Sequence, residues 1–229
     1  MATENHATFF DRFPKTFSAV DILDVNNLLE FGQNIVTFCE MQGAALYPVK
    51  SDVNGNIVKI RNSCENFDVW TVEEMLAREN EANIAKKDSS GSVGLLWLSR
   101  GVELIIESLA ELVRNPDEKM SNLVKIAYEK TLRPYHNRVM SLIFSGGLKM
   151  FPDTKTFLLK LAYNKPDMEE EVMVAMNDFL QTYGQILEPI QMMLAKYDIG
   201  DKSDILERKK EEEKERKRER SERSERKYM

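Results

Sequence analysis

Apolar residues recur at intervals of three and four along most of the chain, a spacing that predicts amphipathic helices. The first such segment covers residues 17–39, where polar Asp21, Asn27 and Gln33 separate the apolar positions. Those apolar positions are Val25, Leu28, Leu29, Ile35, Val36 and Cys39. We find no alternation of apolar and polar residues long enough to predict a β-strand. The pattern therefore predicts an all-α fold.

Local signals predict where the next helices begin and end. Thr71-Val-Glu-Glu74 has the form of a capping box, which predicts a helix from there to about residue 85. The loop 86–91, KKDSSG, is an evident surface break. The segment 92–114 is apolar nearly all round, so we expect a central helix that ends at Asn115-Pro116.

Prolines divide the second half of the chain. Pro134 interrupts a helical pattern over residues 119–144 and, because it lacks a backbone donor, should kink or split that helix. Residues 154–163 and 168–197 supply the last predicted core helices. We expect the second of these to be one helix kinked at Pro189.

Three polar residues, Asp52, Asn56 and Lys59, lie at i, i+4 and i+7 within the stretch 45–60. On a helix this spacing places a carboxylate, an amide and an ammonium on one face. Together these groups can satisfy neighbouring hydroxyls of a sugar or a small polar headgroup. Asn54-Gly55 is a turn signal, however, and the alternative is a loop followed by the start of a solvated helix.

Composition narrows the class of protein. The 229 residues are 42% hydrophobic, which suits one large domain with a sizeable core. The net charge of -6 gives no support to nucleic-acid binding. The two cysteines, Cys39 and Cys64, have no metal-ligand spacing and predict reduced core thiols of a cytosolic protein. No signal-peptide pattern opens the chain, and polar residues interrupt the apolar segment 93–109, so we expect no membrane span.

The composition changes after about residue 203. Residues 207–229 hold eleven basic and eight acidic residues, several of them in the acid-before-base order that favours a helix. We therefore divide the chain into a folded domain, 1–203, and a charged tail, 204–229, that is disordered or forms a solvated helix. Contact of this tail with an anionic membrane is the alternative role.

Catalytic chemistry finds little support in the sequence. The two histidines, His6 and His136, belong to no recognisable pair of nucleophile and base. The glycines do not form a phosphate-cradling pattern after a strand. We predict a non-enzymatic protein with no catalytic residue, no metal and no cofactor. Taken singly, His136 and Trp97 are more typical of structural residues than of a site.

Three motifs follow one another along the chain: Asp52-x3-Asn56-x2-Lys59, then GLLWLSRG, then AYEKTLRPYH. In this order and with these intervals they resemble the glycolipid transfer protein family, over about residues 24–197. The resemblance implies an all-α sandwich of two layers, with about eight helices and a lipid pocket between the layers. It also implies a protein that takes up one sphingolipid from a membrane without covalent chemistry.

The resemblance assigns roles to single residues. The headgroup site would consist of Asp52, Asn56, Lys59 and Trp97, with the Trp97 ring stacked on the first sugar. Asp52 would accept from sugar hydroxyls and from the ceramide amide N–H, while His136 would donate to the amide carbonyl. The apolar positions that would hold the lipid chains are Phe38, Leu46, Val49, Leu132, Phe144, Phe157 and Leu161. These residues can equally be simple core, and the two interpretations differ only in whether the core can open.

The resemblance also implies partners: a glycosphingolipid ligand and transient peripheral contact with membranes, for a monomer in the cytosol. The family often carries a membrane-docking tryptophan two residues after the histidine, where this chain has Arg138. We therefore expect docking through Tyr135, Phe151 and nearby lysines.

Two alternative functions stay open at this point. One is an all-helical adaptor or lipid sensor that binds sphingolipid without delivering it. The other is a carrier of ceramide-1-phosphate, whose phosphate is best held by several arginines or lysines. The branch of the family that carries this lipid uses arginine where this chain has Val93 and Trp97, so we expect neutral glycosylceramides to be preferred.

Overall fold

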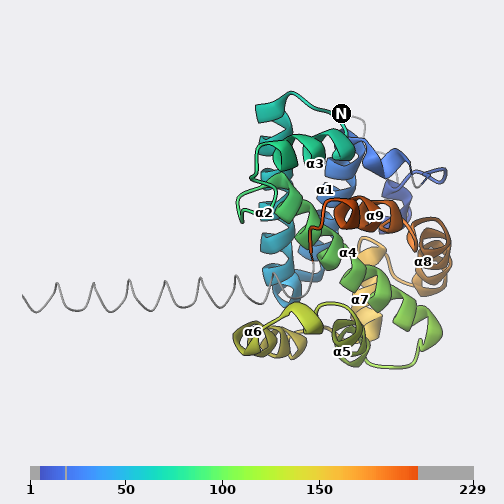
Figure 1. Ribbon diagram of the computed structural model, residues 1–229. Helices are drawn as coiled ribbons and strands as arrows, with labels where there is room; N and C mark the ends of the chain where they lie inside the picture. The colour runs from blue at the N-terminus through green and yellow to red at the C-terminus, as the bar shows by residue number, and fades with distance from the viewer. Residues whose placement is uncertain (1–5, 19, 201–229) are drawn as a thin grey trace, which may run out of the picture. The chain divides into compact units, whose positions relative to one another are not determined.

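The computed structural model describes residues 6–18 and 20–200, which form nine α-helices and four short 3-10 helices (Figure 1). The α-helices are α1 (Val25–Gln42), α2 (Tyr47–Phe67), α3 (Val72–Glu81), α4 (Gly91–Arg114), α5 (Met120–Lys130), α6 (Arg138–Leu148), α7 (Thr154–Leu161), α8 (Glu169–Tyr183) and α9 (Glu188–Lys196). The 3-10 helices are η1 (Phe9–Arg12), η2 (Asp21–Leu23), η3 (Gly43–Leu46) and η4 (Arg133–Tyr135). These described residues contain no named strand, so the all-α prediction is confirmed.

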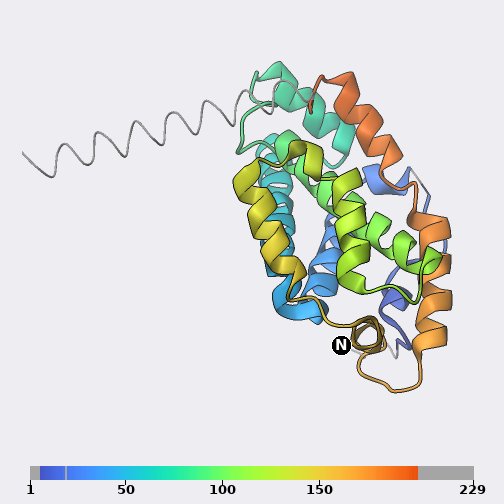
Figure 2. The same cartoon turned by 90° about the horizontal axis from the view of Figure 1, so that it is seen from below.

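Helix contacts arrange the described part of the chain in two layers, as predicted. In one layer α1 packs against α2, and in the other α4 packs against α5 and α8. The contact between α2 and α4 joins the two layers, while α7 touches both α1 and α8 (Figure 2). The predicted charged tail, 204–229, lies outside the described residues. Among the described residues, no helix is both long enough and apolar enough to span a membrane.

Side-chain caps determine where the first helices begin. The Asp24 carboxylate accepts from the backbone N–H groups of Asn26 and Asn27, so α1 starts at Val25 rather than at residue 17 as predicted. The predicted capping box between Thr71 and Glu74 is confirmed at the start of α3. That helix ends at Glu81, short of residue 85, and Asn83 just beyond it has a left-handed backbone with φ 54°.

The central position of α4 is confirmed, because 18 of its 24 residues are buried. Its N-terminus is held by the carboxylate of Glu79, a residue that is only 1% exposed. This carboxylate accepts from the backbone N–H of Gly91 at 2.7 Å, from that of Ser92 at 2.8 Å and from the hydroxyl of Ser63 at 2.6 Å. A negative charge that satisfies the first N–H groups of a helix stabilises it and here also ties α4 to α2 and α3.

Prolines break the second half of the chain in two ways. Pro134 lies in η4, between α5 and α6, so the predicted split at this proline is confirmed. The prediction of one helix over 168–197 kinked at Pro189 is wrong. The break lies earlier, between the end of α8 at Tyr183 and the start of α9 at Glu188. Pro189 is in the first turn of α9, where its missing N–H costs nothing.

Aromatic rings anchor the N-terminal segment to the rest of the helices. The ring centroid of Phe13 lies 4.8 Å from that of Phe179 and 5.6 Å from that of Phe31. Tyr183 stacks on Phe179 at 4.8 Å and donates its hydroxyl to the carbonyl of Pro14 at 2.9 Å. Burial raises the pKa of Tyr183 to about 12. The cluster thereby joins the N-terminal segment to α1 and α8.

Both cysteines are buried free thiols, as predicted from their scarcity and spacing. Burial raises the pKa of Cys39 to about 12 and that of Cys64 to about 11. Neither thiol is therefore a nucleophile at neutral pH, because the reactive form is the thiolate.

Candidate functional site

Helix α2 carries the three predicted polar residues on one unbroken helix. It continues from Tyr47 to Phe67 through Asn54-Gly55, so the alternative of a loop at this place is wrong. The Asn56 amide is 3% exposed and donates to the carboxylate of Asp52 at 3.1 Å. Asp52 itself is exposed. The buried amide thus orients an accessible carboxylate.

Glycines allow α4 to lie close against α2 in an antiparallel direction. A Cβ placed on Gly94 would meet the Cβ of Lys59 at 2.9 Å and the backbone oxygen of Asn56 at 3.0 Å. A Cβ on Gly91 would meet Ser63, and one on Gly101 would meet Val53. We call this contact line the α2–α4 seam. Its register places Trp97, one turn after Gly94, on the part of α4 that runs beside Asn56.

Arg100 joins the Trp97 ring to the segment that carries the predicted histidine. Its guanidinium carbon lies 5.0 Å from the centroid of the Trp97 ring and 3.5 Å from that of Tyr135. Arg100 is only 6% exposed, and burial lowers the pKa of its guanidinium. The neighbouring Tyr135 and Glu103 act in the opposite direction and raise this pKa. A desolvated cation between two aromatic faces is a strong contact, so Arg100 fixes η4 against α4.

His136 is brought to Trp97 by this arrangement. The two rings lie 6.3 Å apart between centroids, with 27° between their planes. On its other side, His136 Nδ1 lies 3.1 Å from the hydroxyl of Tyr128, which also lies 3.2 Å from the hydroxyl of Ser141. The Tyr128 hydroxyl donates to Ser141, whose own hydroxyl donates to the Asn137 carbonyl at 2.9 Å, so the Tyr128 oxygen is left to accept from Nδ1–H of His136. This contact holds the His136 ring in place beside Trp97.

The predicted site residues are therefore gathered along the α2–α4 seam in a definite order. Asp52, Asn56 and Lys59 follow one another along α2, while Trp97 lies on α4 and His136 just after η4. Lys59 is at the far end of the row, where its ammonium lies 3.3 Å from the carboxylate of Asp88 in the loop before α4.

An apolar cavity of about 20 Å³ lies between the two layers. It is lined by Phe38, Leu46, Val49, Leu104, Ile105, Ser108, Met120, Val124, Phe151 and Phe157. Four of the seven predicted chain-pocket residues are among them. A space of this size holds about one water molecule, so a lipid chain would have to push the walls apart.

The other three predicted pocket residues lie outside this lining. Leu132 is buried in a cluster with Leu104 and Tyr128, against which Phe144 and Trp97 pack. The Phe144 ring stacks on Tyr128 with 3.7 Å between centroids. Leu161 is fully buried on α7, one turn after Phe157. The cluster around Tyr128 connects the cavity wall at Leu104 with the rings beside His136.

A comparison with protein families decides the relationship. The family model described as glycolipid transfer protein matches residues 23–163, which is more than half of the chain. The chain belongs to the glycolipid transfer protein family. It is 31% identical over 175 residues to glycolipid transfer protein 1 of Arabidopsis thaliana, covering 76% of this chain and 84% of that one. It is 29% identical over 190 residues to a glycolipid transfer protein of Aureobasidium melanogenum, covering 76% and 92% of the two chains.

Solved structures of the glycolipid transfer protein fold agree with this membership. A FAPP2 structure, described as selecting simple glycosphingolipids with this fold, superposes with a TM-score of 0.73 at 22% identity. The alignment covers 88% of this chain and 97% of that one. Mouse ceramide-1-phosphate transfer protein superposes with a TM-score of 0.70 at 19% identity, over 78% and 89% of the two chains. At such identities these likenesses establish the fold alone.

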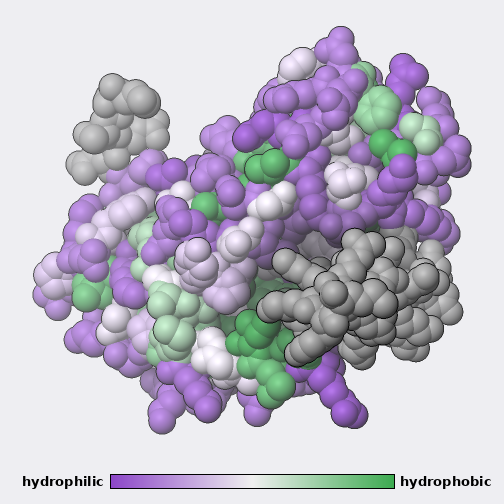
Figure 3. Space-filling model, turned by 90° about the vertical axis from the view of Figure 1, so that its left-hand side faces the viewer, coloured by the Kyte–Doolittle hydropathy of each residue, from purple (hydrophilic) through white to green (hydrophobic). Residues whose placement is uncertain are grey.

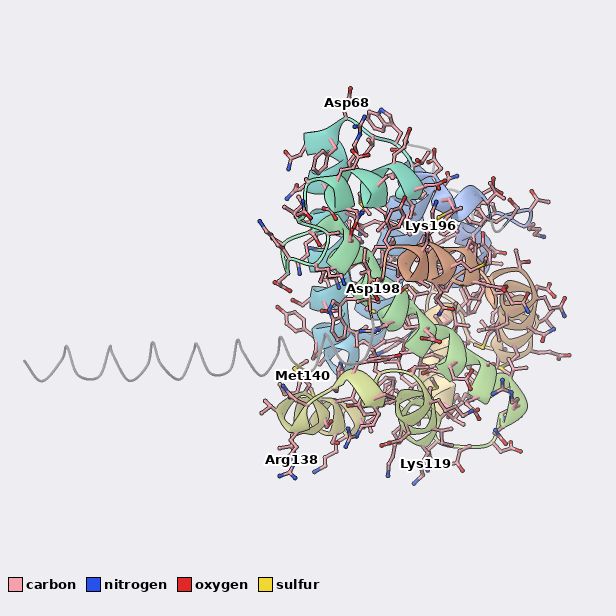
Figure 4. The ribbon with its side chains drawn as sticks, in the orientation of Figure 1. Asp68, Lys119, Arg138, Met140, Lys196 and Asp198 are labelled. Atoms are coloured by element: carbon pink, nitrogen blue, oxygen red, sulfur yellow. The ribbon has the colours of Figure 1, made fainter. Side chains whose placement is uncertain are left out.

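Helix α6 differs from the other α-helices of the described chain in how little of it is buried. None of its eleven residues, all of them described, is buried. Its most exposed apolar side chains are Val139 at 64%, Met140 at 39%, Leu142 at 72% and Ile143 at 49%. Figure 4 shows Arg138 at its start projecting outward. In Figure 3 hydrophobic surface gathers at the lower end of the molecule, where Figure 1 places α6.

Two of the side chains expected to dock on membranes make contacts within the protein instead. The ring of Tyr135 lies against Arg100, and Phe151 lines the cavity. The sequence prediction of membrane-docking residues therefore missed the exposed apolar face of α6. The available signal was four apolar residues within five positions. It also missed the stacking of Arg100 on Tyr135 and the pairing of Lys59 with Asp88, for which no short-range pattern exists.

Proposed function

We propose that this protein is a non-enzymatic carrier that binds one glycosphingolipid and moves it between membranes. It would work in the cytosol and touch membrane surfaces only transiently. Membership of the glycolipid transfer protein family supports this function. The observation that supports it most is the α2–α4 seam, which has Asp52, Asn56 and Lys59 on one helix and Trp97, beside His136, on the other.

The headgroup would lie over Trp97 and along the polar row of α2. A half-exposed indole offers a flat face to the C–H side of a sugar ring. Asp52, oriented by Asn56, would accept from the sugar hydroxyls at the edge of that ring. A phosphate would find no arginine at Val93, which is buried, or at Trp97. These features favour a neutral sugar over a phosphate.

The ceramide amide would be held from two sides. Asp52 would accept from the amide N–H, and the His136 ring would donate to the amide carbonyl. Tyr128 supports this second role, since its hydroxyl lies 3.1 Å from Nδ1 and fixes the orientation of the imidazole ring. Amide, sugar and indole would then be fixed relative to one another before the chains enter the protein.

The hydrocarbon chains would enter the space between the layers. Each methylene kept from water contributes about 0.8 kcal/mol, so a long chain can supply the energy needed to part the cavity walls. Helix α6, which ends three residues before the cavity-lining Phe151, buries no residue of its own and can therefore be displaced at low cost. Its exposed apolar face, flanked by the exposed cations Arg133, Arg138 and Lys149, would meet the membrane during uptake.

A transfer assay between vesicles tests this function. Labelled galactosyl-, glucosyl- and lactosylceramide should move from donor to acceptor vesicles on addition of the protein. Ceramide-1-phosphate should move far more slowly. If no glycosylceramide moves, the proposed function is wrong, and if ceramide-1-phosphate moves fastest, the proposed role of Trp97 as a sugar platform is wrong.

A further inference from the structure

The loop between α3 and α4 presents one carboxylate to the polar row of α2. Asp88 Oδ1 lies 3.3 Å from Lys59 Nζ, although the two residues are 29 positions apart. The side chain of Lys59 is 26% exposed and that of Asp88 is 77% exposed. The pair is therefore open to a ligand, and Asp88 is the residue that faces it.

Hydrogen bonds on both sides of Asp88 give this loop a defined shape. The Ser90 hydroxyl donates to the carbonyl of Ala85 at 2.9 Å, and the Ser90 N–H donates to the carbonyl of Lys87 at 3.0 Å. Lys86 pairs with Asp198 at 2.6 Å. Asp88 thus stands on a closed turn, and its position beside Lys59 does not depend on the weak ion pair alone.

The register of the α2–α4 seam places this pair at the outer end of the headgroup site. Asp52 would hold the ceramide amide and the inner side of the sugar, and Lys59 follows it by seven residues. Seven residues of helix span about 10 Å, so the Lys59–Asp88 pair lies about 10 Å from the amide end. At that distance it faces the far side of the first sugar or the beginning of a second one.

The charges at this outer end favour an uncharged group. A sugar hydroxyl can donate to Asp88 while accepting from Lys59, so both members of the pair keep a partner. A sulfate or phosphate accepts from Lys59 but cannot donate to Asp88, and its charge is repelled by that carboxylate. Of the neighbouring lysines, Lys86 is engaged by Asp198, and Lys87 is exposed on the same loop.

We propose that Asp88 is a specificity-determining residue that admits neutral sugar and discriminates against headgroups with a negative charge at their outer end. This inference rests on the proposed function, because it assumes that Lys59 contacts a glycolipid headgroup. It extends that function by assigning the choice between neutral and anionic glycolipids to a loop residue outside the three sequence motifs.

Galactosylceramide and its 3-sulfated form provide a matched pair of probes, because they differ only in the charged group on the sugar. The ratio of their transfer rates is measured in vesicles of phosphatidylcholine for the full chain, Asp88→Asn, Asp88→Lys and the control Asp117→Asn. Asp117 is an exposed carboxylate in the loop between α4 and α5, so this control changes the net charge by the same amount as Asp88→Asn. The ratio cancels any change in membrane docking.

We expect Asp88→Asn to raise the sulfated-to-neutral ratio about fivefold and Asp88→Lys to raise it further, with no change in Asp117→Asn. Raising the salt concentration should weaken the discrimination by the unchanged protein, because screening shortens the range of the repulsion. An unaltered ratio in both Asp88 variants would overturn the inference while leaving galactosylceramide transfer intact. Loss of galactosylceramide transfer by the unchanged protein would overturn the proposed function and, with it, this inference.

Discussion

The α2–α4 seam and helix α6 are built in opposite ways. At the seam, Gly94 brings two helix backbones together so closely that no further carbon fits, and the Asn56 side chain is almost fully buried. At α6, no residue is buried, and a Cβ on Gly146 would have no described atom within 4 Å. Tight packing preserves distances between groups, whereas sparse packing lets an element move at low cost. We therefore expect the α2–α4 seam to stay rigid when it binds the headgroup and α6 to move when the hydrocarbon chains enter.

The largest effect should come from removing the carboxylate that the seam orients. Asp52→Val should lower glycosylceramide transfer about 100-fold, because hydrogen bonds to a charged group contribute about 1.5 to 3 kcal/mol each. The fold should survive, since Asp52 is exposed. Transfer rate and melting temperature are measured together. A folded variant with full transfer activity would show that Asp52 does not bind the lipid.

Filling the seam should damage both stability and recognition. An alanine Cβ at Gly94 would clash with the Lys59 Cβ and the Asn56 backbone oxygen, so Gly94→Ala should cost about 1 to 2 kcal/mol of unfolding free energy. Glycosylceramide transfer should fall with it. Gly55→Ala on α2 is the control, because a Cβ there has open space and alanine favours a helix. Equal stability of the two variants in urea unfolding would contradict the tight packing of the seam.

The support of His136 by Tyr128 should have a smaller effect. Tyr128→Phe keeps the ring that stacks on Phe144 but removes the hydroxyl beside Nδ1. Without this partner the imidazole ring is held less firmly, and transfer should fall about fivefold, as expected for about 1 kcal/mol. Ser141→Ala removes the other partner of that hydroxyl and should leave transfer nearly unchanged. If both variants behave alike, Tyr128 does not act through His136.

The smallest effect, and one of opposite sign for stability, should come from stiffening α6. Gly146→Ala should stabilise the protein by up to about 1 kcal/mol, because alanine is the better helix former and meets no neighbour. If α6 must move for uptake, the same change should slow transfer about twofold. Faster or unchanged transfer in the stabilised variant would indicate that α6 stays in place while the lipid enters.

Much of the fold could be predicted because helices and their ends have local sequence signals. Periodicity gave the helices, the Thr71 capping box gave the start of α3, and Pro134 gave the break before α6. The turn signal Asn54-Gly55 misled, since packing of α2 against α4 overrides local preference. The start of α1 was predicted too early, because the apolar pattern continues on both sides of Asp24. The side-chain cap of Asp24, and not the pattern, determines where α1 begins.

The site was only partly predictable, and the reason is sequence distance. The three motifs supplied Asp52, Asn56, Lys59, Trp97 and His136, and whether they bind lipid stays a prediction. The stacking of Arg100 on Tyr135 joins residues 35 positions apart, and the Lys59–Asp88 pair joins residues 29 apart. Such contacts depend on how helices pack. The size of the cavity depends on ten side chains from several helices and was equally out of reach.

Hydrogen exchange with and without bound glucosylceramide tests the contrast between the two regions most directly. Backbone amides of α2 and α4 along the seam should exchange slowly in both states, while those of α6 should exchange fast without lipid and slow down on binding. This result would support a rigid headgroup site and a mobile helix α6. Equal protection of α6 and α4 in the lipid-free protein, with no change in α6 on binding, would contradict it.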